Sequence, residues 1–332
     1  MPRITIGVMT LVGAVIATNA MAQTRDQNWQ RCVDEDSDLR IAACTAIINS
    51  KTELPEDLAI AFYDRGNAYE GNHKYDAAIK DYDEAIKLKP TFAEAFDNRA
   101  NAYYFERKYE LAINDYSEAI KLKPDYAKAL NNRGVAYHDE GRYDRAIRDY
   151  DRAIKLVPSF AEAFNNRGLV YEAKDEHDRA IRDYDQAIRL NPNIALVFDD
   201  RGIAYRHKGQ FDRAIQDFDR AIEIKPDYGF AFYNRGLAYE GKGDYDRAIE
   251  DYDRAIRLEP SYANAFYNRG NAYSFKGEYG RAIDDYNQAI KLKPDYSDAL
   301  YHRGIAERAQ GNDTAGANDI AAAKRLDPKV GK

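Results

Sequence analysis

The stretch AKALNNRGVAYHDEGRYDRAIRDYDRAIKLVPSF, residues 127–160, decides the fold of this chain. Its first half carries Leu130, Gly134 and Tyr137 at helical spacing, and its second half carries a similar apolar series that begins at Ala146. Apolar residues three and four positions apart form one face of an amphipathic helix. The stretch therefore predicts two amphipathic helices, A and B, joined by a glycine-containing turn.

The same pattern recurs along most of the chain with a 34-residue period, and prolines mark this period most clearly. A period of this length is typical of a supersecondary repeat that buries its apolar face by stacking on copies of itself. Proline ends each helix B because it lacks an N–H and clashes with the preceding turn. The recurring prolines are Pro90, Pro124, Pro158, Pro192, Pro226, Pro260, Pro294 and Pro328. The predicted repeats are 59–92, 93–126, 127–160, 161–194, 195–228, 229–262, 263–296 and 297–330.

When the proline is numbered as position 32, the first seven repeats share an aromatic residue or Leu at position 4, Gly or Ala at 8, Tyr at 11, Ala at 20, Tyr or Phe at 24 and Ala at 27. The eighth repeat departs from this pattern, with Glu307 at position 11 and Ile320 at position 24. The shared pattern resembles the tetratricopeptide repeat. Together the eight repeats span 59–330, most of the chain. The resemblance implies an all-α fold, a right-handed α-solenoid of eight helix-turn-helix repeats over residues 54–330. It also implies that helices A line the concave side of the superhelix.

Two positions of the repeat depart from the family's pattern. Position 7, usually apolar in the family, is arginine in all eight repeats, and position 23 is aspartate in all eight. An arginine on a packing face cannot be buried unpaired without a cost of roughly several kcal/mol. We therefore predict a structural ladder of Arg–Asp pairs between helices A and B; the alternative is that both residues lie on solvated faces of recently duplicated repeats. The residues are Arg65, Arg99, Arg133, Arg167, Arg201, Arg235, Arg269 and Arg303 with Asp81, Asp115, Asp149, Asp183, Asp217, Asp251, Asp285 and Asp319.

The residues after each proline predict helix caps. Ser159 followed by Glu162, and Thr91 followed by Glu94, have the pattern of a capping box. Short polar residues hold the same place in the other repeats: Asp125, Asp227, Asp295, Asn193 and Ser261. We expect these side chains to accept a hydrogen bond from the first turn of the next helix A.

The segment 1–22 differs in kind from the repeats. Arg3 gives a short positive end, the segment 4–17 is an apolar run, and Ala20-Met21-Ala22 offers an A-x-A cleavage site. This arrangement predicts a secretory signal peptide; the alternative is an uncleaved anchor, although the run is shorter than the ~20 residues that a membrane span needs. Cleavage changes the formal net charge from −7 to −8. We expect a bacterial protein that is exported, periplasmic or secreted.

Cys32 and Cys44 are the only cysteines, and both lie in the segment 23–53 before the first repeat. In an oxidising compartment two cysteines this close in sequence predict one disulfide, with free thiols as the alternative. The disulfide would pin a small helical cap whose core is too thin to hold alone. No metal site is expected, because two cysteines are too few ligands and the histidines are scattered. The histidines are His73, His138, His177, His207 and His302.

Composition and motifs exclude several classes of function. The sequence contains no H-E-x-x-H motif, no G-x-S-x-G motif and no phosphate-binding loop. Its carboxylates recur with the repeat, so each acidic pair copies a structural feature and predicts no enzyme and no cofactor. A net charge of −7 gives no basic stripe for nucleic acid. The chain is therefore expected to bind protein.

In the family, positions 2, 5, 6, 9, 12 and 13 of helix A face the groove, and position 6 is mostly asparagine here. The asparagines are Asn98, Asn132, Asn166, Asn234 and Asn268, with Asp64, Asp200 and His302 in the other repeats. An asparagine both donates and accepts hydrogen bonds, so a column of them can pair with the backbone of an extended peptide. The alternative is that asparagine is only a neutral exposed residue beside the arginine.

The groove positions carry eleven acids and three basic side chains, a net charge of −8. The acids are Asp64, Glu70, Glu94, Asp97, Asp139, Glu162, Glu172, Asp199, Asp200, Glu240 and Asp298, and the basic residues are Lys128, Arg206 and Arg308. A concave wall of one sign attracts the opposite charge. We therefore predict a basic, extended peptide or protein segment as the ligand, with Tyr233, Tyr267 and Tyr301 at position 5 as aromatic anchors.

These features predict a non-enzymatic protein–protein interaction scaffold of the bacterial cell envelope. The alternative is a self-assembling structural protein that uses its end faces or its groove. In that case the basic tail with Lys324, Arg325, Lys329 and Lys332 would be a possible guest in the groove of a neighbouring copy.

Overall fold

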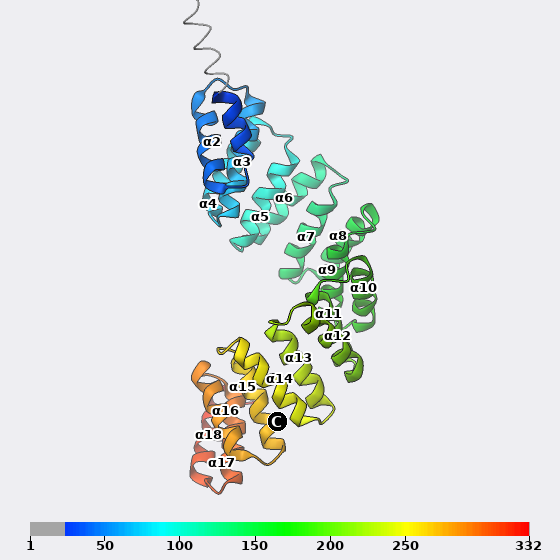
Figure 1. The fold of residues 1–332 in the computed structure, drawn as a ribbon, viewed down its shortest axis with the longest axis vertical. Coiled ribbons are helices and arrows are strands. Elements are labelled where there is room, and N and C mark those ends of the chain that lie inside the picture. Colours follow the sequence, from blue (N-terminus) through cyan, green and yellow to red (C-terminus); the bar gives the residue numbers. More distant parts are fainter. Residues whose placement is uncertain (1–23, 332) are drawn as a thin grey trace, which may run out of the picture. The chain divides into compact units, whose positions relative to one another are not determined.

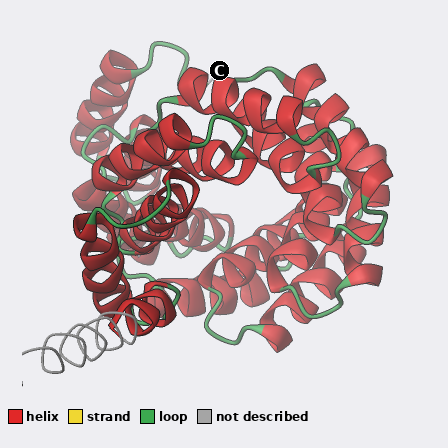
Figure 2. Cartoon of the chain, turned by 90° about the horizontal axis from the view of Figure 1, so that it is seen from above, coloured by secondary structure: helices red, strands yellow, loops and turns green. Residues whose placement is uncertain are grey.

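The computed structural model describes residues 24–331, and the predicted signal peptide lies outside this range. The described residues form helices and connecting loops, without strands (Figure 2). The chain divides into an N-terminal half, Met1–Pro158, and a C-terminal half, Ser159–Lys332. Each half is a row of antiparallel helix pairs, so the predicted all-α solenoid of helix-turn-helix repeats is confirmed.

The N-terminal half begins with a helix over residues 24–32, followed by α2 (Ser37–Ser50) (Figure 1). Three helix pairs follow: α3 (Pro55–Gly71) with α4 (Tyr75–Leu88), α5 (Ala93–Phe105) with α6 (Tyr109–Leu122), and α7 (Ala127–Asp139) with α8 (Tyr143–Leu156). The first helix of each pair is a helix A and the second is a helix B.

The C-terminal half continues with five pairs. They are α9 (Ala161–Ala173) with α10 (His177–Leu190), α11 (Ala195–His207) with α12 (Phe211–Ile224), α13 (Gly229–Gly241) with α14 (Tyr245–Leu258), α15 (Ala263–Phe275) with α16 (Tyr279–Leu292), and α17 (Ser297–Ala309) with α18 (Asp313–Leu326). Each helix A in this half begins at position 1 of its repeat.

The core of a repeat is an aromatic ring of helix B packed against a small residue of helix A. In the third repeat, a Cβ added to Gly134 would lie 2.6 Å from Cε1 of Tyr150, so the glycine lets the ring approach the backbone. The position-24 rings are almost completely buried in seven repeats: Tyr82, Tyr116, Tyr150, Tyr184, Phe218, Tyr252 and Tyr286. Burying a ring of this size is the main apolar contribution of a repeat.

The turn between helices A and B contains one residue with left-handed backbone in every repeat. Glycine holds this position in five repeats, as at Gly141 with φ of 71°. His73, Arg107 and Asp175 adopt the same conformation with φ of 56–60°. The turn geometry is therefore preserved even where a side chain makes it less favourable.

The predicted capping boxes are wrong. Helix A of the second repeat begins at Ala93 and helix A of the fourth at Ala161, and neither helix has a side-chain cap hydrogen bond. The residue before each helix is Phe92 or Phe160, so the Thr and Ser expected as caps lie one position too early. Backbone bonds close the turn instead, as from the N–H of Ala93 to the carbonyl oxygen of Thr91 at 3.1 Å.

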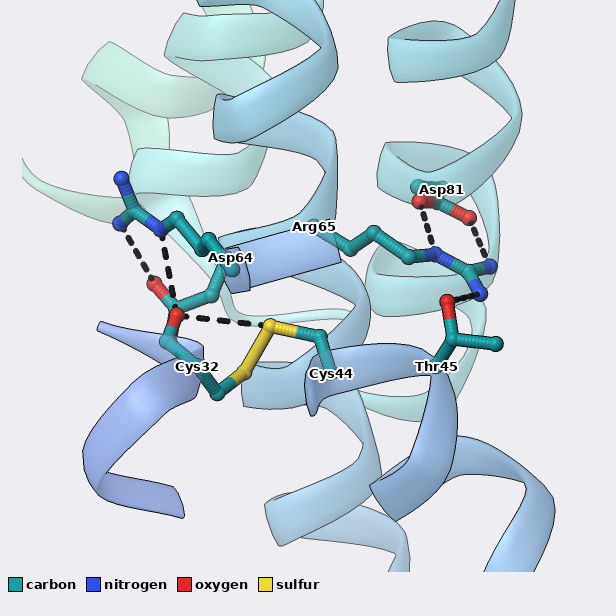
Figure 3. The surroundings of a disulfide bond; sticks show 7 residues. Cys32, Cys44, Thr45, Asp64, Arg65 and Asp81 are labelled. Carbon is teal, nitrogen blue, oxygen red and sulfur yellow. Dashed lines mark hydrogen bonds and ion pairs between the residues drawn. A yellow bond between two sulfur atoms is a disulfide. The ribbon is translucent and has the colours of Figure 1, made fainter. Parts of the chain in front are cut away.

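The predicted disulfide joins Cys32 to Cys44 and is confirmed (Figure 3). Both cysteines are fully buried and pack with Ile47 of α2 and Ala61 of α3. The bond therefore holds the 24–32 helix and α2 together as a small cap against the first repeat. Among the described residues no helix is long and apolar enough to cross a membrane.

Candidate functional site

Each arginine at position 7 donates two hydrogen bonds to the aspartate at position 23 of its own repeat. Arg133 of α7 donates from Nε to Oδ2 of Asp149 at 2.7 Å and from Nη2 to Oδ1 at 2.8 Å. The other pairs have the same two bonds at 2.5–2.8 Å: Arg65–Asp81, Arg99–Asp115, Arg167–Asp183, Arg201–Asp217, Arg235–Asp251, Arg269–Asp285 and Arg303–Asp319. The structure thus brings together all eight predicted pairs, which we call the ladder.

The third nitrogen of the guanidinium can reach the element that precedes the repeat. Nη1 of Arg99 donates to Asp83 of α4 at 2.6 Å, and Nη1 of Arg133 donates to Ser117 of α6 at 2.9 Å. At the N-terminal end, Arg65 lies between Asp81 and Thr45 of the cap, and donates to Thr45 at 3.0 Å (Figure 3). An arginine with this third bond joins three helices through one rigid planar group.

The asparagines at position 6 lie where successive helices A meet. We call this side, formed by positions 5, 6, 9 and 12, the A-face. Nδ2 of Asn98 donates to Asn67 at 2.7 Å and to the hydroxyl of Tyr63 at 3.0 Å, both on α3. Nδ2 of Asn268 likewise donates to Tyr233 at 2.8 Å. The amide nitrogens of this column thus connect neighbouring repeats, a role that the repeat pattern did not predict.

The other predicted A-face polar residues occupy equivalent places. Asn132 donates to Asn101 at 3.2 Å, Asn166 is half-buried on α9, and His302 lies on α17 beside Tyr267. Asp64 on α3 is buried and lies 3.6 Å from Arg40 of α2. Burial raises the pKa of Asp64, and Arg40 opposes that rise.

The position-5 aspartates are more deeply buried than a ligand-lined groove suggests. Asp97 of α5 is fully buried, and it accepts hydrogen bonds from Tyr126 at 3.3 Å and Asn132 at 3.4 Å. Lys128 adds an ion pair at 3.4 Å. Burial raises the pKa of Asp97, and Lys128 opposes that rise.

Asp199 and Asp200 are adjacent on α11 and both are buried. Both carboxylate oxygens of Asp199 accept from Nδ2 of Asn234 at 3.1 Å. Burial raises the pKa of Asp199 to about 6. Burial and the charge of Asp199 raise the pKa of Asp200 to about 7, although a hydrogen bond from Asn165 opposes the rise. Oδ2 of Asp200 is buried and has no hydrogen-bond partner among the described residues.

The tyrosines at position 5 are partly buried by contacts within their own chain. Tyr233 and Tyr267 are half-buried, and their rings lie 4.7 Å from Tyr262 and 5.0 Å from Tyr296. Tyr301 is half-buried on α17. Much of each predicted anchor is therefore already in contact with its own chain or partly covered by it.

The repeat pattern did not predict a more exposed anchor at position 2. Phe230 at this position is 56% exposed beside Tyr262, and both rings line a hollow of about 250 Å³. An apolar residue at position 2, as at Leu196, which is also exposed, was the available signal.

The structure also brings together Glu172 of α9, His177 of α10 and His207 of α11. Nδ1 of His177 lies 3.0 Å from Oε2 of Glu172, and Nδ1 of His207 lies 2.5 Å from Oε1. The expectation that the histidines are scattered is therefore wrong for this pair. Tyr75 and Phe105 hold the same two repeat positions and stack at 5.3 Å, so the repeat register was the signal that could have identified this cluster.

Comparison with known proteins agrees with the repeat pattern. Two family models match the sequence: one described as "TPR repeat" at residues 107–141, 136–175, 202–243 and 241–274, and one described as "Tetratricopeptide repeat" at 59–92, 161–194 and 263–296. No curated protein matches the sequence.

Two solved structures with TM-scores of 0.59 have the same fold. A tetratricopeptide repeat protein from Parabacteroides merdae is 19% identical over 78% of this chain and 99% of its own, with a TM-score of 0.59. The APC/C hetero-tetramer Cut9–Hcn1 is 17% identical over 88% of this chain and 57% of its own, also with a TM-score of 0.59. YrrB, described as "a TPR protein with an unusual peptide-binding site", is 26% identical over 57% of this chain and 97% of its own, with a TM-score of 0.48.

The family models and the helix pairs together indicate a protein–protein interaction scaffold. The chain belongs to the tetratricopeptide repeat family.

Proposed function

We propose that this protein is a non-enzymatic scaffold of the bacterial cell envelope that binds an extended, basic segment of a partner protein on its A-face. The observation that carries the proposal is the pair Asp199 and Asp200 on α11. Oδ2 of Asp200 is buried and has no hydrogen-bond partner among the described residues. A buried carboxylate oxygen without a partner is costly, and an arriving lysine or arginine supplies both the missing donor and the opposite charge.

The asparagine column favours an extended ligand. The bonds of Asn98 and Asn234 to the neighbouring helix use their Nδ2 atoms. An amide also has a carbonyl oxygen that accepts hydrogen bonds, and peptide N–H groups are its natural donors. Because asparagine recurs at position 6 in five of the eight repeats, the column matches a ligand whose backbone runs along the A-face.

An apolar anchor lies close to the aspartate pair in the C-terminal half. Tyr228 hydrogen-bonds Asp199 through its hydroxyl. Its ring lies 6.3 Å from that of Phe230, and both rings line the 250 Å³ hollow. A ligand with a basic side chain next to an apolar one fits this arrangement, since interfaces combine a buried aromatic anchor with charged contacts.

The envelope location rests on two observations. A buried disulfide is stable in an oxidising compartment such as the bacterial periplasm, and Cys32 and Cys44 form one. The segment 1–22 has the composition of a secretory signal peptide.

The proposal is tested with fluorescein-labelled peptides of one length, in which lysine, glutamine or glutamate occupies every third position between alanine and leucine. Fluorescence anisotropy should show saturable binding of the lysine peptide alone. The double variant D199N/D200N should bind it about tenfold or more weakly, since a hydrogen bond between charged groups is worth roughly 1.5–3 kcal/mol.

The control D125N/D295N removes the same number of carboxyl groups at two exposed turn positions and should bind the lysine peptide normally. Equal binding of all three peptides, or equal loss in both variants, would refute the proposal.

The self-assembly alternative used the basic C-terminal tail as a guest in a neighbouring copy. Val330 of this tail is buried and packs with Leu300 of α17 and Ala323 of α18. Val330 therefore lies on the last repeat of its own chain, and this part of the tail would have to detach before it could enter another molecule. No observation favours this alternative over the scaffold.

A further inference from the structure

We propose that Glu172, His177 and His207 form a binding site for a divalent transition-metal ion, with Zn²⁺ as the representative ion. One carboxylate oxygen and two imidazole nitrogens lie within 4.8 Å of one another. They come from three consecutive helices of the C-terminal half, α9, α10 and α11. The proposal does not rest on the peptide-binding function, although Glu172 holds position 12 of the A-face.

The donor set suits a borderline metal ion. Zn²⁺ binds histidine nitrogen and carboxylate oxygen at about 2.0–2.2 Å, and sites with three protein ligands leave a fourth position for water or another ligand. The same nitrogen and oxygen donors bind Ni²⁺ and Cu²⁺. The side chains are 14%, 21% and 41% exposed for Glu172, His177 and His207, so the cluster is held by the fold and remains open to solvent on one side.

Glu172 has different hydrogen-bond partners from the glutamates at the same position of other repeats. Glu70 and Glu240 hold the same repeat position, and each accepts a hydrogen bond at 2.7 Å from the position-24 tyrosine of its own repeat. Glu172 instead faces the two histidines. The hydroxyl of Tyr184, its expected donor, is buried without a hydrogen-bond partner among the described residues.

The histidines replace a packing contact that other repeats make with aromatic rings. Tyr245 and Phe275, equivalent to His177 and His207, stack with ring centroids 5.1 Å apart. The imidazole rings lie at a similar separation of 5.4 Å but are tilted by 50°. The repeat geometry therefore places two ligating side chains at this point of contact between successive repeats.

Arg206 is the nearby group that opposes a cation. Its Nη2 lies 3.1 Å from Nε2 of His207, which accepts from it and so directs an Nδ1 proton toward Glu172. Binding of a metal through Nδ1 moves the proton of His207 to Nε2, so Arg206 has to withdraw. The buried Nε of Arg206 has no hydrogen-bond partner among the described residues, so no bond of that atom holds the side chain in place.

The test is isothermal titration calorimetry of the full chain with ZnCl₂ alone, after a chelator and dialysis have removed bound metal. We expect one ion per chain. In thermal unfolding experiments the midpoint should rise with Zn²⁺ concentration, because an ion that binds the folded state stabilises it. H177Y restores the tyrosine found in five other repeats and H207A removes the second imidazole. Each should weaken Zn²⁺ binding by more than the roughly 10–100-fold that loss of an outer contact costs.

Matched substitutions separate the site from general binding by surface groups. E172Q should lose affinity, whereas E240Q, at the same repeat position, should not. H138A removes a histidine elsewhere and should also leave binding unchanged. R206A should bind Zn²⁺ more tightly than the unaltered chain. The proposal is overturned if Zn²⁺ binding is not saturable at one ion per chain, or if H177Y and H207A bind as the unaltered protein does.

Discussion

The ladder and the A-face bury the same kind of side chain in two different ways. Asp217 of the ladder is buried, but it accepts two hydrogen bonds from Arg201, at 2.8 and 2.6 Å. Asp199 of the A-face is equally buried and accepts from the uncharged Asn234. The ladder is the same in all eight repeats, whereas the A-face changes from one repeat to the next. The positions that stay the same in every repeat therefore carry the Arg–Asp pairs between helices A and B, and the positions that vary are those at which we propose ligand binding.

The electrostatic consequence differs in the same way. Burial raises the pKa of Asp217, but the bonds and charge of Arg201 oppose the rise. The pKa of Asp199 reaches about 6 because amide and hydroxyl donors compensate burial less well than a guanidinium does. Two aspartates of similar burial thus differ in how firmly they hold their charge near neutral pH.

The largest loss of stability should follow from removing a ladder carboxylate. D217A leaves the largely buried Arg201 without its bidentate partner and should reduce the free energy of unfolding by about 3–5 kcal/mol. Urea unfolding followed by circular dichroism measures the loss, and hydrogen exchange tests whether it centres on α11 and α12. The double variant R201M/D217L should lose less than D217A, because no largely buried charge is then left unpaired. Only Asp185, which also accepts from Arg201 at 2.6 Å, loses its partner, and its side chain is 42% exposed. A loss below that of the exposed control D125A would contradict the structural role of the ladder.

A smaller effect should appear when the A-face is titrated. The pKa values of Asp199 and Asp200, about 6 and 7, lie above the ordinary value of 3.8, so the folded chain binds these protons more tightly than the unfolded chain. Their contribution to stability is therefore complete below about pH 4 and is lost as the pH rises through 6 and 7. We expect a loss of about 2–4 kcal/mol between pH 5 and 8, because each tenfold difference in proton affinity corresponds to about 1.4 kcal/mol.

The double variant D199N/D200N checks this expectation, since it should flatten the pH dependence of the thermal midpoint. D125N/D295N serves again as the charge-matched control and should keep the slope of the unaltered protein. If both variants have the same slope, the titrating groups lie elsewhere.

The smallest effect should come from ion pairs that recur but are exposed. Lys276 pairs with Asp246 at 2.5 Å, and Lys242 and Lys208 make the same contact in the two preceding repeats. Exposed ion pairs add little to the free energy of unfolding, because water screens the charges and two long side chains must be ordered. K276A should therefore leave the urea midpoint unchanged within error. A loss comparable to that of D217A would show that repetition matters as much as burial.

The fold could be predicted because the 34-residue period specifies both helices, the turn and the core rings. The disulfide could be predicted because only two cysteines occur. Burial of Asp97 could not be predicted, because it depends on Tyr126 and on Asn132 from the next helix A. The Glu172 cluster requires knowing that position 17 of one repeat contacts position 13 of the next. The predicted helix caps were wrong because the helix begins at Ala93, two positions after Thr91, so the Thr91 side chain does not hold the N-cap position.

The three-helix contact of the ladder arginines has a consequence for how this array can change in length. Arg133 donates two bonds within its own repeat and one to Ser117, whereas Arg99 donates its third to Asp83 at the equivalent place. Loss of residues 93–126 by recombination would bring Asp83 to the place of Ser117, so Arg133 would keep a full set of acceptors. Recombination can therefore remove this whole 34-residue block without leaving Arg133 short of an acceptor.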